Sequence, residues 1–128
     1  MNYFIDNNLS PRIARALCAL EGEHGDKVIH LKDKFDQKTT DEEWMTSLGH
    51  EKDWVVITCD KRISKNPYEI KAWKESGLFI VFLKSAWLKI PFWQQSWQII
   101  KRWPEIKESS STNNQSSSIL VPVKGKIE

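Results

Sequence analysis

Residues 54–58, which read Trp-Val-Val-Ile-Thr, constrain the fold more than any other stretch of this 128-residue chain. The run favours a β-strand and is apolar at consecutive positions, so neither face of the strand can be left in water. Strands of this kind are covered on both faces, as in a parallel sheet between layers of helices. A second continuous apolar run, at 78–83, has the same character. The two runs predict buried strands of an α/β protein.

Helix signals alternate with the predicted strands along the first hundred residues. One helix is predicted from Pro11 to Glu21 behind the N-cap Ser10, and another from Asp41 to Leu48 behind a capping box, Thr40 with Glu43. The other predicted elements are a helix from Asn66-Pro67 to Ser76-Gly77, a helix from Pro91 to Trp103 closed by Pro104, and strands at 3–5 and 28–31. Residues 32–39 are predicted to form a charged loop. The β-α-β-α-β-α-β-α order predicts a three-layer α/β/α architecture with a mostly parallel sheet and right-handed crossovers.

The last twenty residues differ in composition from the rest of the chain. Residues 109–118 are polar and low in complexity, which predicts a mobile, flexible loop. Residues 119–123 are strand-like, but Pro122 confines them to a sheet edge or a docked tail. We therefore expect one domain over 1–108, a polar segment over 109–118 and a tail over 119–128 that packs on the domain.

Composition excludes several classes of protein and favours none strongly. The formal net charge of +2 means that any basic surface for nucleic acid must be local. Cys18 and Cys59 form no zinc motif and suggest no disulfide framework, and Cys18 is expected to be a buried thiol. No stretch has the length and apolarity of a membrane span, so the expected location is the cytoplasm. The seven Trp residues are expected to anchor the core or an interface, and the face of the last helix that bears Trp93, Trp97 and Ile100 fits either.

Acidic residues follow two of the predicted strands and begin one of the helices. Asp6 ends the first strand, Asp60 follows the strand at 54–58, and Asp41, Glu42 and Glu43 begin the helix between them. In a parallel sheet all three positions emerge at one edge, where open α/β sheets place ligand sites. Clustered carboxylates need a cation to stay ionised, and Mg²⁺ or Mn²⁺ takes oxygen ligands. Such an ion activates water for attack on a phosphodiester.

Each acid also has a plain structural explanation. Asp6 and Asp60 suit turns, and the acids at 41–43 complement a helix dipole. Glu69 is a candidate fourth ligand, but its position three residues after the N-cap Asn66 favours a structural role. Arg12, Lys61 and Arg62 lie near the predicted acidic edge, where basic side chains can contact backbone phosphates.

The same residues resemble a known family. Residues 4–12 (Phe-Ile-Asp-Asn-Asn-Leu-Ser-Pro-Arg), 41–44 (Asp-Glu-Glu-Trp) and 56–63 (Val-Ile-Thr-Cys-Asp-Lys-Arg-Ile) resemble the PIN-like domain of VapC-type toxins. The likeness extends through 66–69, 77–83, Arg102-Trp103-Pro104 and the apolar ending around Pro122. The resemblance rests on the order and spacing of all these segments together.

The resemblance implies a PIN-like fold over 1–108 and a Mg²⁺- or Mn²⁺-dependent endoribonuclease, the toxin of a bacterial type II toxin–antitoxin pair. It implies that Asp6, Asp41 and Asp60 hold the metal and that Glu43 assists catalysis, with Glu43 as the alternative middle ligand to Asp41. Arg12, Lys61 and Arg62 would contact RNA phosphate. The implied partners are RNA and a cognate antitoxin that covers the acidic edge. The sequence leaves open whether the chain also forms a homo-oligomer.

One departure from the family pattern leaves a rival function open. Many PIN-like proteins carry another acid two residues after the one that Asp60 matches, and here that position is Arg62. The rival is a weak or inactive PIN-like module that binds RNA or a protein. A receiver-like signalling domain also clusters acids at strand ends, but Asp60 followed by two basic residues fits it poorly.

Overall fold

A computed structural model describes residues 1–112 and 117–128 and shows an α/β protein with a five-stranded sheet. The strands are β1 (Asn2–Ile5), β2 (Lys27–His30), β3 (Trp54–Thr58), β4 (Phe79–Leu83) and β5 (Ser118–Val121). Their spatial order is β2-β1-β3-β4-β5, and every neighbouring pair is parallel. The predicted parallel sheet is confirmed, with β5 at an edge as Pro122 requires.

The sheet changes winding direction between β1 and β3. The chain passes from β1 to β2 on one side and then crosses back to place β3 on the other side of β1. In the pairing, Ile5 lies opposite Ile57, so both strands end at the same level. The crevice beyond the carboxyl ends of two such strands is where open α/β sheets bind ligands. Asp6 and Asp60 follow these two strand ends.

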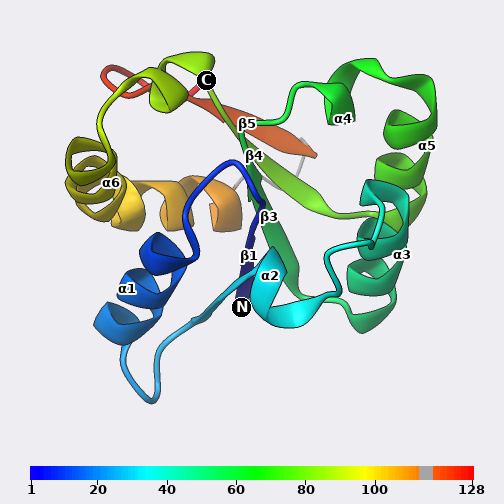
Figure 1. Ribbon diagram of the computed structural model, residues 1–128, viewed down its shortest axis with the longest axis horizontal. Helices are drawn as coiled ribbons and strands as arrows, with labels where there is room; N and C mark the ends of the chain where they lie inside the picture. Colours follow the sequence, from blue (N-terminus) through cyan, green and yellow to red (C-terminus); the bar gives the residue numbers. More distant parts are fainter. Residues whose placement is uncertain (113–116) are drawn as a thin grey trace.

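Helices cover both faces of the sheet, as the continuous apolar runs predict (Figure 1). On one face lie α1 (Pro11–Glu21) and α6 (Phe92–Thr112), and on the other lie α3 (Asp41–Glu51) and α5 (Pro67–Ser76). Three single-turn helices complete the described elements: α2 (Leu31–Lys34), α4 (Arg62–Lys65) and the 3₁₀-helix η1 (Ser85–Lys89). The three-layer α/β/α fold is therefore confirmed.

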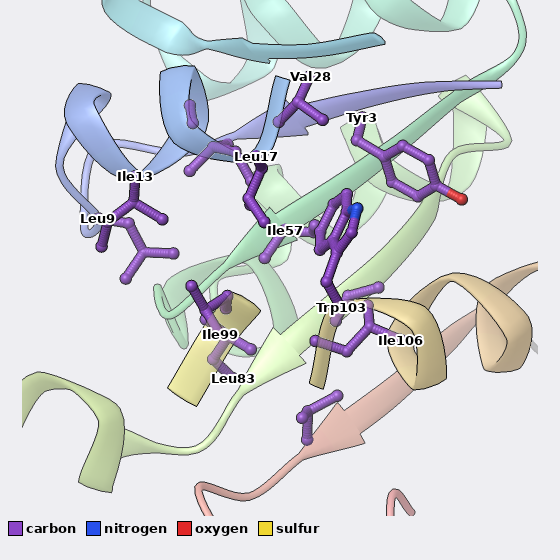
Figure 2. Packing of buried hydrophobic residues seen from close by; sticks show 14 of the residues in the cluster. Tyr3, Leu9, Ile13, Leu17, Val28, Ile57, Leu83, Ile99, Trp103 and Ile106 are labelled. Carbon is purple, nitrogen blue, oxygen red and sulfur yellow. The ribbon is translucent and has the colours of Figure 1, made fainter. Parts of the chain in front are cut away.

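The core has two halves because successive strand residues point to opposite faces. Tyr3 and Ile57 belong to the half beneath α1 and α6. There the rings of Tyr3 and Trp103 pack edge to face with their centroids 5.0 Å apart (Figure 2). Phe4 belongs to the other half, and the centroid of its ring lies 4.9 Å from that of Trp44 in α3. The two halves fix α1 and α3, the helices whose beginnings face the crevice.

The predicted helix starts have the expected caps. The side chain of Ser10 accepts the Arg12 N–H, that of Thr40 accepts the Glu43 N–H, and that of Asn66 accepts the Tyr68 and Glu69 N–H groups. These bonds satisfy donors that the first helical turn leaves open. Local capping chemistry thus placed the starts of α1, α3 and α5 correctly.

The predicted end of the last helix was wrong. Pro104 lies inside α6, which continues to Thr112, so residues 109–112 of the predicted flexible loop are helical. Residues 113–116 of that loop lie outside the described residues. Proline removes one backbone donor, but Trp103 and Ile106 on either side of it are buried in the core. Tertiary packing outweighs the local preference to stop.

Two smaller predictions also need correction, and of the two alternatives for the Trp-bearing face of the last helix, packing on the sheet is excluded. The segment 32–39 is not all loop, because the buried side chain of His30 accepts the Lys32 N–H and caps α2. Cys18 is exposed rather than buried. The α6 face with Trp93 and Trp97 is turned to solvent, since these side chains are 80% and 51% exposed. The buried face of α6 instead contains Ile99, Trp103 and Ile106.

None of the described helices combines the length and apolar character needed to cross a membrane.

Candidate active site

Asp6 is held in place where β1 ends. The Asn7 N–H donates to Asp6 Oδ1 at 2.7 Å, and the Thr58 hydroxyl donates to Asp6 Oδ2 at 2.8 Å. Asn8 Oδ1 accepts the Cys59 N–H at 3.2 Å, which ties the turn after β1 to the loop after β3. Both Asp6 oxygens therefore have partners, and the side chain is 4% exposed.

Asp60 is paired with the residue that replaces an expected acid. Arg62 Nε donates to Asp60 Oδ1 at 3.0 Å, and Arg62 Nη2 donates to Asp60 Oδ2 at 2.7 Å. Arg62 Nη2 also lies 4.0 Å from Asp41 Oδ2. A fork-shaped pair of this kind is strong for an exposed contact. It lowers the pKa of Asp60 below its ordinary value.

Three carboxylates from three elements meet beside this pair. Asp41 begins α3, Asp60 follows β3, and Glu69 lies in the first turn of α5. Each offers an oxygen, and these oxygens lie within 4.8 Å of one another. Asp41 is fixed by the Trp44 indole N–H, which donates to its Oδ1 at 3.0 Å. Because α3 packs on α5, residues 28 positions apart in sequence become neighbours.

Of these three carboxylates, Glu69 has the fewest favourable contacts for its negative charge. Its side chain is 6% exposed, and its Oε1 is a buried oxygen with no hydrogen-bond partner among the described residues. The hydrogen bond that protonated Glu69 can make to Asp41, together with burial, raises the pKa of Glu69 to about 8. Burial also raises the pKa of Asp6, and the negative charges of Asp41 and Asp60 add to that effect.

A cleft of about 360 Å³ lies beside this group, and Glu69 does not line it. Asp6, Asp41 and Asp60 all line it, and Arg62 lies at its wall. The other lining residues are Asn7, Asn8, Leu31, Lys32, Phe35, Asp36, Gln37 and Thr39. The structure thus brings the three predicted metal ligands to one cleft, with Asp6 outside the tighter group of Asp41, Asp60 and Glu69.

Other predicted site residues lie elsewhere. Glu43 is exposed and does not line the cleft, although it shares the first turn of α3 with Asp41. The Arg12 guanidinium lies 4.1 Å from the centre of the Phe92 ring. Lys61 lines a neighbouring pocket, and of the three predicted phosphate-binding residues Arg62 alone lines the cleft.

Sequence reasoning gave Glu69 too little weight. Its N–H is capped by Asn66, as its position in the helix predicted, but its side chain turns into the acidic group. Local spacing favoured the cap over the candidate role as a fourth ligand, because the ligand role depends on α3 packing against α5. Thr58 was likewise not singled out, although its hydroxyl links Asp6 to β3 and accepts the Asp60 N–H at 2.9 Å.

The donor set fits a hard divalent cation. Carboxylate oxygens are the usual ligands of Mg²⁺ and Mn²⁺, and the group has no His or Cys that would favour zinc. The unpaired Oε1 of Glu69 is an acceptor that a cation would satisfy. Asp41, Asp60 and Glu69 can together hold such an ion, and Asp6 lies at the same cleft.

Comparison with known proteins supports the same interpretation. A model of the PIN-like domain family matches residues 1–85, a segment that runs from β1 past β4 and contains all four acids. No curated protein and no solved structure matches the chain. The matched segment covers more than half of the sequence. The chain therefore belongs to the family of PIN-like domains.

Proposed function

We propose that this protein is a Mg²⁺- or Mn²⁺-dependent endoribonuclease. The main support is the group of Asp41, Asp60 and Glu69, in which a buried oxygen of Glu69 faces like charges and has no hydrogen-bond partner in the described part of the chain. PIN-like domains are often nucleases that use divalent metals, so membership of the family points to the same chemistry. RNA as the substrate rests on the resemblance of the motifs to VapC-type toxins.

The residues of the cleft have separable roles in this proposal. Asp41, Asp60 and Glu69 hold the ion, and Asp6 fixes the cleft through its bonds to the β3 end. A bound divalent ion would supply Lewis-acid stabilisation of phosphate oxygens and lower the pKa of water. Arg62, which is 73% exposed and paired with Asp60, would contact the RNA phosphate.

The biological setting that we propose is the toxin half of a bacterial type II toxin–antitoxin pair. A cognate antitoxin would cover the acidic cleft and stop RNA from entering. Expression of the wild-type chain should then arrest growth, and co-expression with the product of the adjacent gene should relieve the arrest. Growth arrest by an Asp41→Asn chain would contradict cleavage as its cause.

The activity is tested by Asp41→Asn with Glu42→Gln as its matched control. Both changes remove one carboxylate from the first turn of α3, but Glu42 does not line the cleft. Asparagine keeps an oxygen for the Trp44 indole, so we expect the fold to persist. Loss of one ligand should lower Mn²⁺-dependent RNA cleavage by at least about a hundredfold, as loss of a positioned catalytic group does. Equal cleavage by Asp41→Asn and the wild type would refute the proposed site.

One observation favours a second function, that of a binding module without catalysis. Arg62 already neutralises Asp60 and so competes with an ion for its oxygens. A chain that binds RNA but neither binds Mn²⁺ nor cleaves RNA would establish this alternative.

A further inference from the structure

A second pocket lies beside the acidic cleft, at the same edge of the sheet. It has a volume of about 570 Å³, which is in the range of small-molecule sites. It is bounded by the β3 end with α4, the β4 end with the start of η1, β5 and one residue of α5. Figure 1 shows α4 beside the ends of these strands.

The segment after β3 forms the wall between the two hollows. Asp60 and Arg62 line the acidic cleft, whereas Cys59 and Lys61 line this pocket. Successive residues therefore alternate between the two sides. A polymer that crosses this wall can place one unit in the pocket while the neighbouring linkage lies at the acids.

The chemistry of the pocket suits a nucleotide. Its floor is apolar and includes Phe82, which is half-buried and meets Trp73 edge to face at 5.6 Å. Unstacked nucleobases bind on aromatic and apolar surfaces of this kind. Its rim has Lys61, Lys65, Ser64 and Ser85, together with Lys84 and the one acid of the pocket, Glu128, which pair with each other.

The lysines of the rim differ in whether they are already ion-paired or can bind an anionic ligand. Lys84 is ion-paired with Glu128. Lys61 and Lys65 are exposed and form no ion pair within the described part of the chain. Unpaired lysines beside an apolar floor attract an anionic ligand, and phosphate contacts of this kind position a strand without reading its sequence.

We propose that this pocket binds the ribonucleotide adjacent to the cleaved bond, with its base on the Phe82 side and its phosphate at Lys61 and Lys65. The inference deepens the proposed ribonuclease function and rests on it. Lys61 then contacts phosphate, as the sequence predicted, but at a position next to the acidic cleft. The pocket selects single-stranded RNA, because a base paired within a duplex cannot enter it.

The test measures RNA binding without cleavage. A 5′-fluorescein-labelled tetraribonucleotide is titrated with protein in EDTA and followed by fluorescence anisotropy, so that no metal-dependent reaction takes place. Ser85→Trp places an indole in the pocket, whereas Ala86→Trp adds the same group to the same exposed turn outside the pocket. We expect Ser85→Trp to weaken binding about tenfold, as loss of one base contact does. Ala86→Trp should bind within twofold of the wild type.

A charge variant tests the phosphate contact separately. Lys65→Ala should weaken binding about threefold, in keeping with the loss of one phosphate contact, while Lys27→Ala at the opposite end of the sheet should not. Thermal melts of the four variants confirm that each one folds. Equal binding by Ser85→Trp and Ala86→Trp would overturn the pocket assignment, and so would absence of wild-type binding at millimolar protein.

Failure of the pocket and failure of the ribonuclease function give different results. If the wild type cleaves RNA with Mn²⁺ and Ser85→Trp cleaves and binds equally well, the pocket assignment is wrong and the activity stands. If the wild type binds the tetranucleotide in EDTA through this pocket but cleaves nothing, the binding site stands and the catalytic proposal fails.

Discussion

Two groups of acidic residues in this protein differ in whether a basic side chain of the protein neutralises their charge. At the amino side of the sheet, Glu21 and Asp26 both accept from Lys107 of α6, and the Trp103 indole N–H also donates to Glu21. Lys107 holds the pKa of each carboxyl below its ordinary value. At the carboxyl edge, Arg62 is the one cation within the described residues that pairs with a member of the group of Asp41, Asp60 and Glu69, and it is engaged by Asp60.

The comparison shows that clustering of acids does not by itself indicate a site. The Lys107 group is compensated within the chain and stabilises the contact of α6 with α1 and β2. In the group of Asp41, Asp60 and Glu69, the pKa of Glu69 is raised to about 8, which means that the fold disfavours its charged form. Excess negative charge is tolerated where a ligand will neutralise it, and this distinguishes a candidate active site from a structural ion pair.

Removal of the internal cation should have the largest effect on stability. In Lys107→Met, Glu21 and Asp26 lose their counter-charge, while the methionine side chain takes the place of the aliphatic part of the lysine. We expect the free energy of unfolding to fall by about 2 kcal/mol, less than for a fully buried pair because the lysine is partly exposed. Lys101→Met on the same helix is the control, since Lys101 forms no ion pair among the described residues and its ammonium lies over the face of Trp97. Urea denaturation measures both, and equal stability of the two variants would show that the Lys107 pairs add nothing.

The pH dependence of the metal-free protein should reveal the uncompensated acid. Glu69 titrates near 4.5 in an unfolded chain and near 8 in the fold. Between these values the folded protein keeps a proton that the unfolded chain has lost, so stability falls as pH rises from about 5 to 8. Glu69→Gln should remove this part of the loss and so stabilise the protein relative to the wild type at pH 8.5. At pH 4 the gain should vanish.

Glu75→Gln provides the control for that experiment. Glu75 lies on the same helix but is 69% exposed, with Lys71 at 3.9 Å. Its change should leave the stability curve within about 0.5 kcal/mol of the wild type at every pH. The interpretation fails if Glu69→Gln and Glu75→Gln give superimposable curves.

The smallest expected effect concerns Arg62. If this side chain competes with an ion for Asp60, Arg62→Ala should tighten Mn²⁺ binding about threefold, the scale of an exposed ion pair. Lys32→Ala removes a charge from the same cleft without breaking a pair to Asp41 or Asp60. A smaller change in Lys32→Ala would separate direct competition from general electrostatics. Equal changes in the two variants would exclude direct competition.

Most of the fold follows from local patterns. Continuous apolar runs predicted β3 and β4, and capping residues predicted where α1, α3 and α5 begin, because both signals act over a few residues. The end of α6 was missed because it depends on the burial of Trp103 and Ile106 beneath the sheet. No property of Pro104 itself contains that information.

The candidate site was predictable in part for the same reason. Strand ends gave Asp6 and Asp60, and parallel topology placed Asp41 at the same edge. Glu69 could not be ranked above a helix cap without knowing that α3 and α5 pack together. Arg12 does not line the cleft and lies over the Phe92 ring, so its contact with phosphate stays a prediction.

The central claim is that the group of Asp41, Asp60 and Glu69 binds a divalent cation, and calorimetric titration of Mn²⁺ into the wild-type protein at pH 7.5 tests it most directly. The claim predicts saturable binding that is lost in Asp41→Asn. It also predicts heats that change with the ionisation enthalpy of the buffer, because Glu69 releases a proton as the ion binds. Absence of binding at millimolar Mn²⁺, or binding that is unchanged in Asp41→Asn, would contradict it.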